Sequence, residues 1–187
     1  GNPCNTNALI ACANAPSISS RQFTAMTRLD QNRAVGQIAE HAGVPASAIR
    51  DVFIWGNHAN TMYPDPRFGT VDGVPITNLL DTKWLQGQFI ETVSTRGKAI
   101  IVARGASSAA SAASAAIDHM RDWWQGTNGR IVSMAIPSEG WYGVPKGLVF
   151  SFPCRCENGS IVVVEDLVLD EFAQSKIDEN IAALLEE

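Results

Sequence analysis

The stretch "GLVFSFPCRCENGSIVVVEDL", residues 147–167, decides the fold class. It holds two runs rich in β-branched and aromatic residues, 147–159 and 160–167, which meet at the turn sequence Glu157-Asn158-Gly159. An Asn-Gly pair between two such runs favours a tight β-hairpin, because both turn residues must adopt positive φ. The sequence therefore predicts two antiparallel strands here, and "RIVSMAIPS" (130–138) predicts a further strand before them.

The rest of the chain predicts mostly helices, which stand apart from these strands instead of alternating with them. Apolar spacing and turn residues predict helices over 5–15, 23–43, 79–105 (interrupted near Arg96-Gly97), from 107 onward and from about Asp170 to the end. Residues 48–58 form a strand-like run. Residues 59–75 are expected to form an exposed excursion with a short strand pair near 70–74. Helices segregated from an antiparallel sheet are typical of the α+β class.

Composition narrows the kind of protein. The 187 residues suffice for one domain, with 45% hydrophobic residues, 18% charged residues and a net charge of -5. No block of Lys and Arg is present, which argues against nucleic acid as a partner. No apolar run approaches the length of a membrane span, so we expect no membrane insertion. The cysteines at 4, 12, 154 and 156 lack the two-residue gap of a zinc knuckle, so we expect no metal site.

The candidate chemistry centres on His58, in "IWGNHANTMYP" (54–64). This histidine could be a core residue, a metal ligand, a surface residue or an acid–base group at the mouth of a pocket. Upstream, "MTRLDQNR" sets Asp30 and Arg33 on one helical face, either as a surface ion pair or as two functional groups. A carboxylate can orient an imidazole, and a guanidinium can hold a substrate carboxylate through two parallel hydrogen bonds.

Five segments at their observed spacings carry a family resemblance. They are "GNPCNTNALI" (1–10), "MTRLDQNR" (26–33), "IWGNHANTMYPD" (54–65), "RGASSAASAA" (104–113) and "YGVPKGLVFSFP" (142–153). Together they resemble the C-terminal half of malate dehydrogenase, in the cytosolic-type branch of the lactate/malate dehydrogenase family. The resemblance covers essentially all 187 residues in order, although each motif alone is weak.

The resemblance implies a catalytic centre. His58 would take the proton from the malate hydroxyl as a hydride leaves for the nicotinamide, and would return it in the reverse direction. Asp30 would orient His58. Arg33 would hold a carboxylate of malate or oxaloacetate.

The resemblance also implies residues around the substrate and the cofactor. Asn2 would contact the substrate beside the nicotinamide, and Gly1 would lie at the cofactor as well. Ser107 and Ser108 match a segment whose helix end lies near the substrate. We expect them to cap that helix, because serine is a favoured N-cap residue, with Ser108 also lining the pocket.

A nucleotide-binding half is not recognisable in these residues, because no G-x-G-x-x-G turn follows a strand. We therefore expect 1–187 to be the substrate-binding and catalytic C-terminal domain, with residues 1–10 a remnant of its junction with a missing nucleotide-binding half. The resemblance implies NAD as cofactor, malate and oxaloacetate as substrates, a homodimer and a cytoplasmic location.

Two alternatives stay open. A lactate dehydrogenase built on this scaffold would use the same groups, although ordinary lactate dehydrogenases carry a G-E-H-G-D-S type segment where residues 56–61 read Gly-Asn-His-Ala-Asn-Thr. A non-catalytic assembly domain would keep His58 only as a vestige. The joint presence of Asp30, Arg33 and His58 favours an enzyme, since a scaffold needs none of the three.

Overall fold

The computed structural model describes all 187 residues, and its main sheet is antiparallel. Strand β6 (Val132–Pro137) pairs with β7 (Val149–Glu157), which pairs with β8 (Ser160–Val163). At the β7–β8 turn, Asn158 and Gly159 have φ values of 51° and 76°, as a two-residue hairpin requires. The predicted hairpin is confirmed.

Two smaller sheets lie beside the main one. Strand β2 (Phe53–Trp55) pairs with β3 (Tyr63–Asp65), and a second sheet has the order β1 (Ile49–Arg50), β4 (Thr70–Val71) and β5 (Val74–Pro75). The end of β2 is tied to the main sheet. Gly56 N–H donates to Ser151 O at 3.1 Å, and Ser151 N–H donates to Gly56 O at 2.8 Å.

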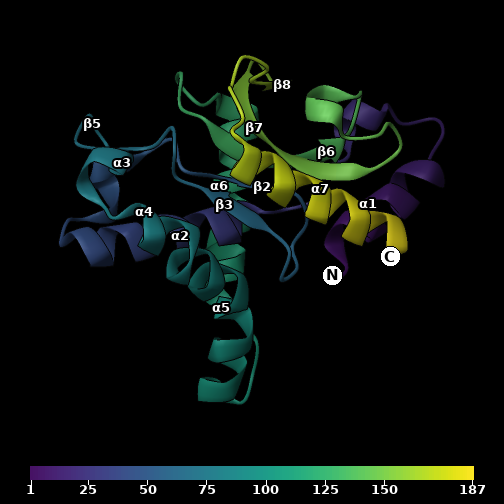
Figure 1. The fold of residues 1–187 in the computed structure, drawn as a ribbon. Coiled ribbons are helices and arrows are strands. Elements are labelled where there is room, and N and C mark those ends of the chain that lie inside the picture. Colours follow the sequence, from purple (N-terminus) through teal and green to yellow (C-terminus); the bar gives the residue numbers. More distant parts are fainter.

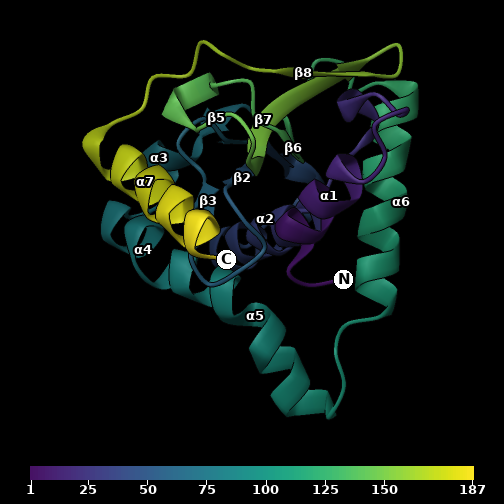
Figure 2. The same cartoon turned by 90° about the vertical axis from the view of Figure 1, so that its right-hand side faces the viewer.

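Helices surround these sheets (Figure 1). They are α1 (Cys4–Ala13), α2 (Arg28–Ala42), α3 (Ile76–Leu79), α4 (Thr82–Gln86), α5 (Gln88–Arg104), α6 (Ala110–Gln125) and α7 (Glu171–Glu186), with short 3-10 turns η1 (Ser20–Gln22), η2 (Ala46–Ala48) and η3 (Trp141–Gly143). None of these helices has both the length and the apolar character that crossing a membrane demands. The two chain ends lie on the same side of the molecule in Figures 1 and 2.

The hydrophobic core has two main parts. The larger one joins the main sheet to β2, β3 and α7, and includes Trp55, Phe152 and Ile177, all fully buried. The second joins α2 to α5 and the small strands through residues such as Ile38 and Phe89. Helix α2 packs against α5, α6, β2 and β6, so its side chains reach the interior from several directions. This central position makes α2 suited to carry site residues.

The start of α2 differs from the prediction of a helix from residue 23. Ala25 N–H donates to Ala135 O at 2.8 Å, and the hydroxyls of Thr27 and Ser151 share a hydrogen bond of 2.7 Å. Segment 23–27 therefore pairs with the sheet, and the helix begins at Arg28. The predicted stop is confirmed, since Gly43 ends the helix in the left-handed conformation with φ of 68°.

The predicted interruption near Arg96-Gly97 is wrong. Helix α5 runs unbroken through these residues, and the break lies at Gly87, between α4 and α5. Gly87 has φ of -120° and ψ of -99°. A Cβ built at this position would lie 2.9 Å from Lys83 O. The close backbone approach, which only glycine allows without displacement, explains the place of the break.

The excursion over 59–75 is only partly exposed, which corrects the prediction. Tyr63 and Asp65 are buried. Asp65 can be buried because its carboxylate accepts from Trp55 Nε1 at 3.0 Å and pairs with Arg67 at 2.7 Å. The short strand pair predicted near 70–74 is confirmed as β4 and β5.

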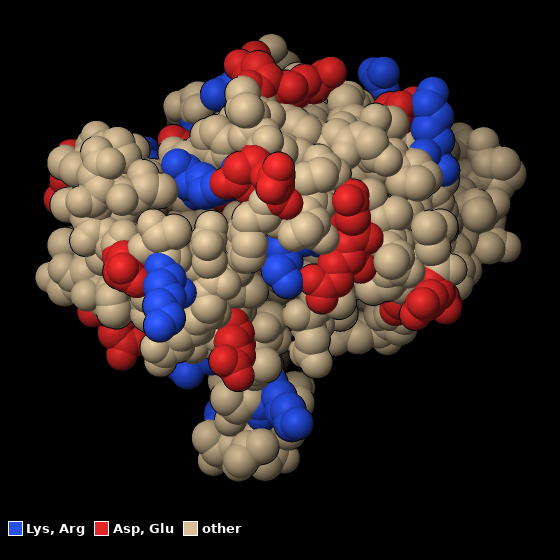
Figure 3. All heavy atoms as spheres, in the orientation of Figure 1, with Lys and Arg blue, Asp and Glu red and all other residues tan.

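One part of the molecule projects from the rest. The C-terminal half of α5, the connection after it and the start of α6 extend beyond the body in both views (Figures 1 and 2). We call residues 98–113 the arm, and none of them is buried. Val102 is 78% exposed. On the face shown in Figure 3, acidic and basic side chains are interspersed and neither sign dominates.

Candidate active site

His58 lies in a turn just beyond β2. Its side chain is 20% exposed, so the ring is mostly covered yet reachable from outside. Nδ1 faces the protein, while Nε2 makes no hydrogen bond to the protein and is not a buried unpaired atom. His58 is therefore neither a core histidine nor a free surface residue. No group of three or more His, Cys, Asp or Glu side chains is placed to hold a metal ion.

Asp30 binds the ring of His58. Its side chain is fully buried, and Oδ2 forms a hydrogen bond with His58 Nδ1. Because a carboxylate only accepts, this contact places the imidazole proton on Nδ1 and leaves the Nε2 lone pair free. Asp30 lies in the first turn of α2, where the helix dipole favours a negative charge. The predicted pairing of these two side chains is present in the structure.

Arg33 lies one turn further along α2. Its Nη1 donates to Asp30 Oδ1 at 3.1 Å, so one carboxylate joins the imidazole and the guanidinium. The Arg33 side chain is only 12% exposed. A surface ion pair, the alternative reading of this i, i+3 spacing, is excluded. The guanidinium also lies near Gly97 of α5, where an added Cβ would be 3.7 Å from Nη1.

Ser108 contacts Arg33 instead of capping a helix. Arg33 Nη2 donates to Ser108 Oγ at 3.5 Å, a long hydrogen bond. The N-cap residue of α6 is Ala109, and no side chain caps this helix. The expectation that Ser107 and Ser108 cap α6 is therefore wrong. Because α6 begins at Ala110, the N-cap position falls on Ala109, which follows both serines. Ser108 lies beside the guanidinium, and its place in a substrate pocket stays a prediction.

Asn2 and Gly1 are not brought into contact with His58. Both residues are exposed, and Gly1 O accepts a hydrogen bond of 3.1 Å from Asn7 Nδ2. They precede α1, whose Asn5 does reach the backbone of His58. Their roles at substrate and cofactor stay predictions.

Three groups thus converge at one place: an imidazole with a free nitrogen, a buried carboxylate and a guanidinium. Comparison with known proteins identifies the family to which the chain belongs. Residues 27–187 match the family model of the lactate/malate dehydrogenase α/β C-terminal domain. The chain belongs to the lactate/malate dehydrogenase family.

Solved structures of this family have the same fold. Malate dehydrogenase from Naegleria fowleri superposes with a TM-score of 0.93 at 46% identity, covering 99% of this chain and 57% of that one. Trichomonas vaginalis lactate dehydrogenase, solved in complex with NADH and oxamate, gives 0.95 at 36% identity, covering 100% of this chain and 59% of that one. The chain thus spans less than two thirds of the length of either dehydrogenase. Malate dehydrogenase from Aeropyrum pernix shares the fold at 22% identity with a TM-score of 0.86.

The family's C-terminal domain has helices on antiparallel sheets, and the α+β class predicted from the sequence is confirmed. The predicted resemblance to the C-terminal half is confirmed as well, because the family model is that of the C-terminal domain.

Sequence reasoning missed two residues at this site. Asn5 and Asn180 are buried and bind the backbone of residues 56–58. A signal for Asn180 was present, since it stands on the buried face of α7 with Ala173, Ile177 and Leu184. A polar residue within an apolar stripe of helical spacing indicates a specific hydrogen bond in the interior.

The other two histidines, together with Cys154 and Cys156, lie outside this site. His41 is exposed and stacks on Trp84, with ring centroids 3.9 Å apart. Burial, reinforced by Arg28 and opposed by Asp122, lowers the pKa of His119 from 6.5 to about 4. Cys154 and Cys156 are free and buried, in agreement with reduced, structural thiols, and burial raises the pKa of both.

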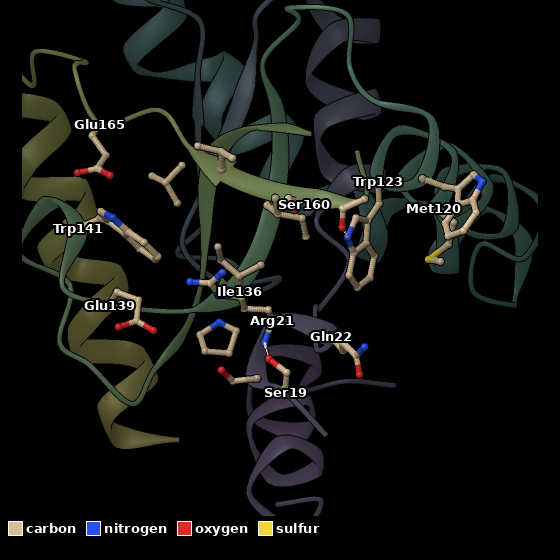
Figure 4. A pocket seen from close by; sticks show the side chains of 17 residues that line it. Ser19, Arg21, Gln22, Met120, Trp123, Ile136, Glu139, Trp141, Ser160 and Glu165 are labelled. Carbon is tan, nitrogen blue, oxygen red and sulfur yellow. Dashed lines mark hydrogen bonds between the residues drawn. The ribbon is translucent and has the colours of Figure 1, made fainter. Parts of the chain in front are cut away.

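A large cavity of about 710 Å³ lies elsewhere (Figure 4). Its lining includes Trp123, Trp141 and Ile161, with Arg21 and Glu139 among the polar side chains. None of Asp30, Arg33, Ser108 or His58 lines it. We place the candidate active site at His58, because the chemistry there depends on groups held in mutual contact and not on cavity size.

Proposed function

We propose that this chain is the catalytic domain of an NAD-dependent malate dehydrogenase, which interconverts (S)-malate and oxaloacetate. The observation that carries the proposal is the contact of Asp30 with both His58 and Arg33. In a family of 2-hydroxy acid dehydrogenases, this contact supplies an acid–base group and a carboxylate-binding group within reach of one small molecule.

His58 acts at Nε2. In malate oxidation this nitrogen takes the hydroxyl proton, and in oxaloacetate reduction it returns the proton to the oxygen that has become an alkoxide. Asp30 holds the ring by Nδ1 and stabilises the imidazolium that forms. Arg33 binds the carboxylate beside the reacting carbon, because its planar fork matches the two oxygens of a carboxylate.

NAD would supply the hydride acceptor for this reaction. In this proposal, Gly1 and Asn2 would meet the nicotinamide end of such a cofactor. Both residues are exposed and precede α1, and residues 1–187 contain no glycine-rich phosphate-binding turn. The partner of this domain in the proposal is therefore a nucleotide-binding half. Residues 1–10 form its junction, although most of them fold as part of α1.

Lactate dehydrogenase is the second candidate. The 36% identity with the Trichomonas vaginalis enzyme extends over the whole chain, and the His58–Asp30–Arg33 arrangement suits pyruvate as well as oxaloacetate. A further group would be needed to recognise the second carboxylate of oxaloacetate, which pyruvate lacks. None of His58, Asp30 and Arg33 has that role in the proposal.

The test is the oxidation of NADH by the full-length protein with oxaloacetate and pyruvate in parallel. Preference for oxaloacetate supports the proposal, and preference for pyruvate supports lactate dehydrogenase. Absence of turnover with both substrates contradicts the assignment of a dehydrogenase and revives the non-catalytic assembly domain. The proposal includes a homodimer and a cytoplasmic location, which sedimentation of the full-length protein and cell fractionation would test.

A further inference from the structure

The turn that carries His58 is bound by two asparagine side chains. Residues 56–58 lie beyond the last β2–β3 pair, so several of their backbone groups need partners outside that sheet. Asn5 of α1 donates through Nδ2 to Gly56 O at 3.2 Å and accepts at Oδ1 from His58 N–H at 3.2 Å. Asn180 of α7 accepts at Oδ1 from Asn57 N–H at 3.2 Å. Three consecutive residues are thus held by side chains from opposite ends of the sequence.

Both asparagines are fixed in turn. Asn5 is 2% exposed and Asn180 is 0% exposed. The second amide hydrogen of Asn5 goes to Val149 O at 2.9 Å, and Asn180 donates to Thr61 O at 2.6 Å and to Lys176 O at 2.9 Å. Since every amide hydrogen has a partner, neither side chain can rotate without leaving a buried polar group unpaired.

The turn and α7 fit each other closely. Gly56 has φ of 94°, a value that favours glycine. A Cβ built on Gly56 would lie 1.9 Å from Asn180 Oδ1. Glycine at this position therefore lets the α7 side chain reach the backbone of the turn directly.

We propose that Asn5 and Asn180 are positioning residues that fix the His58 ring for proton transfer. This inference rests on the proposed role of His58 as the acid–base group. Asp30 holds Nδ1, and the two asparagines hold the backbone from which the ring projects, so together they set where Nε2 points. Neither asparagine hydrogen-bonds to Arg33. Their loss should therefore reduce turnover and leave substrate binding nearly unchanged.

The test compares Asn5→Ala and Asn180→Ala with Leu184→Ala in the full-length protein. Leu184 lies on the same buried face of α7 as Asn180 and contributes only apolar contacts, so its variant reports loss of α7 packing alone. Each asparagine variant should lower kcat roughly 10–100-fold, because small displacements of a catalytic group have effects of this size. KM for the preferred substrate should change less than about threefold, and Leu184→Ala should keep kcat within about threefold of the parent.

The solvent deuterium isotope effect on kcat gives a second readout. It should increase in both asparagine variants, because a displaced imidazole slows the proton transfer, and it should not change in Leu184→Ala. An unchanged kcat and isotope effect in the asparagine variants would overturn the inference. An equal loss of kcat in Leu184→Ala would also overturn it, since general packing would then account for the effect.

Amide hydrogen exchange separates this inference from the proposed function. If the parent protein turns over neither oxaloacetate nor pyruvate, the acid–base role fails, but the exchange rates of the Asn57 and His58 amides can still be measured. Asn180→Ala should speed exchange at Asn57, and Asn5→Ala should speed it at His58. Unchanged rates would mean that the asparagines do not hold the turn.

Discussion

The His58 turn and the arm make opposite use of polar and apolar residues. In the turn, residues 56–58 are bound by buried asparagines, and His58 touches a fully buried carboxylate. In the arm, residues 98–113, no residue is buried, and apolar side chains such as Val102 are exposed. Arg33 lies between the two, because it contacts Asp30 on one side and Ser108 on the other.

This difference indicates how the domain divides its work. Buried polar contacts are costly to break, since each group loses its partner where water cannot replace it, so the turn holds its geometry. The arm has one side-chain hydrogen bond, the long contact of Ser108 with Arg33, and otherwise presents mostly small and apolar side chains. In the proposed function, the acid–base pair of His58 and Asp30 lies entirely outside the arm, whereas Arg33 also contacts the arm through Ser108.

The largest effect is expected for His58→Gln in the full-length protein. Glutamine can keep a hydrogen bond to Asp30 but cannot exchange a proton, so kcat should fall roughly 10²–10⁴-fold, the usual contribution of a general acid–base group. KM should change little. The control is His41→Gln, at an exposed histidine in the last turn of α2, at the other end of that helix from Asp30, which should leave kcat nearly unchanged. An unchanged kcat in His58→Gln would show that His58 is not the acid–base group.

Arg33 lies between the His58 turn and the arm, and Arg33→Ala should weaken substrate binding. Two charge-assisted hydrogen bonds at about 1.5 kcal/mol each amount to about 3 kcal/mol, or roughly 150-fold in kcat/KM. Most of this loss should appear in KM for oxaloacetate. Arg33→Lys keeps the charge without the planar fork and should recover only part of the loss. Equal KM values for the parent and Arg33→Ala would contradict the assignment.

The buried His119 should make the free energy of unfolding decrease in acid. Burial, reinforced by Arg28 and opposed by Asp122, lowers its folded-state pKa from 6.5 to about 4. Thr24 Oγ1 lies 3.3 Å from Nε2. The unfolded chain therefore binds the proton first as pH falls. The contribution of His119 to the free energy of unfolding is therefore complete above about pH 6.5 and declines towards about pH 4, by at most about 3.5 kcal/mol at about 1.4 kcal/mol per pKa unit.

Urea unfolding of the parent and of His119→Gln across this pH range measures that contribution. The parent should lose more stability than the variant between the two limits, because only the parent carries the buried imidazole. Parallel pH profiles would show that His119 is as easily protonated in the folded protein as in the unfolded chain.

The smallest effect is expected in the arm. For the 187-residue chain alone, Val102→Ser should change the free energy of unfolding by less than about 0.5 kcal/mol, as for most exposed positions. Phe89→Ala, in the buried half of the same helix, should cost about 3–5 kcal/mol. Chemical denaturation compares the two. A large cost for Val102→Ser in the full-length protein only would show that the rest of the protein covers the arm.

Local patterns predicted most of the elements. The Asn-Gly turn after Glu157 predicted the β7–β8 hairpin, and Gly43 predicted the end of α2. The predictions were wrong where a residue contacts a segment that is distant in the sequence. Segment 23–27 reads as helix but pairs with Ala135, and Tyr63 reads as part of an exposed excursion but is buried. Partners more than a hundred residues away leave no local signal.

By itself, the sequence determined the hairpin, the α+β class and the three residue types of the candidate site, because these depend on spacing along the chain and on side-chain chemistry. Only the tertiary structure decided that Asp30 joins His58 to Arg33, that Ser108 stands beside the guanidinium, and that Asn5 and Asn180 bind the turn. These contacts join residues brought together by packing. A buried polar group must find its partner in space, wherever that partner stands in the sequence.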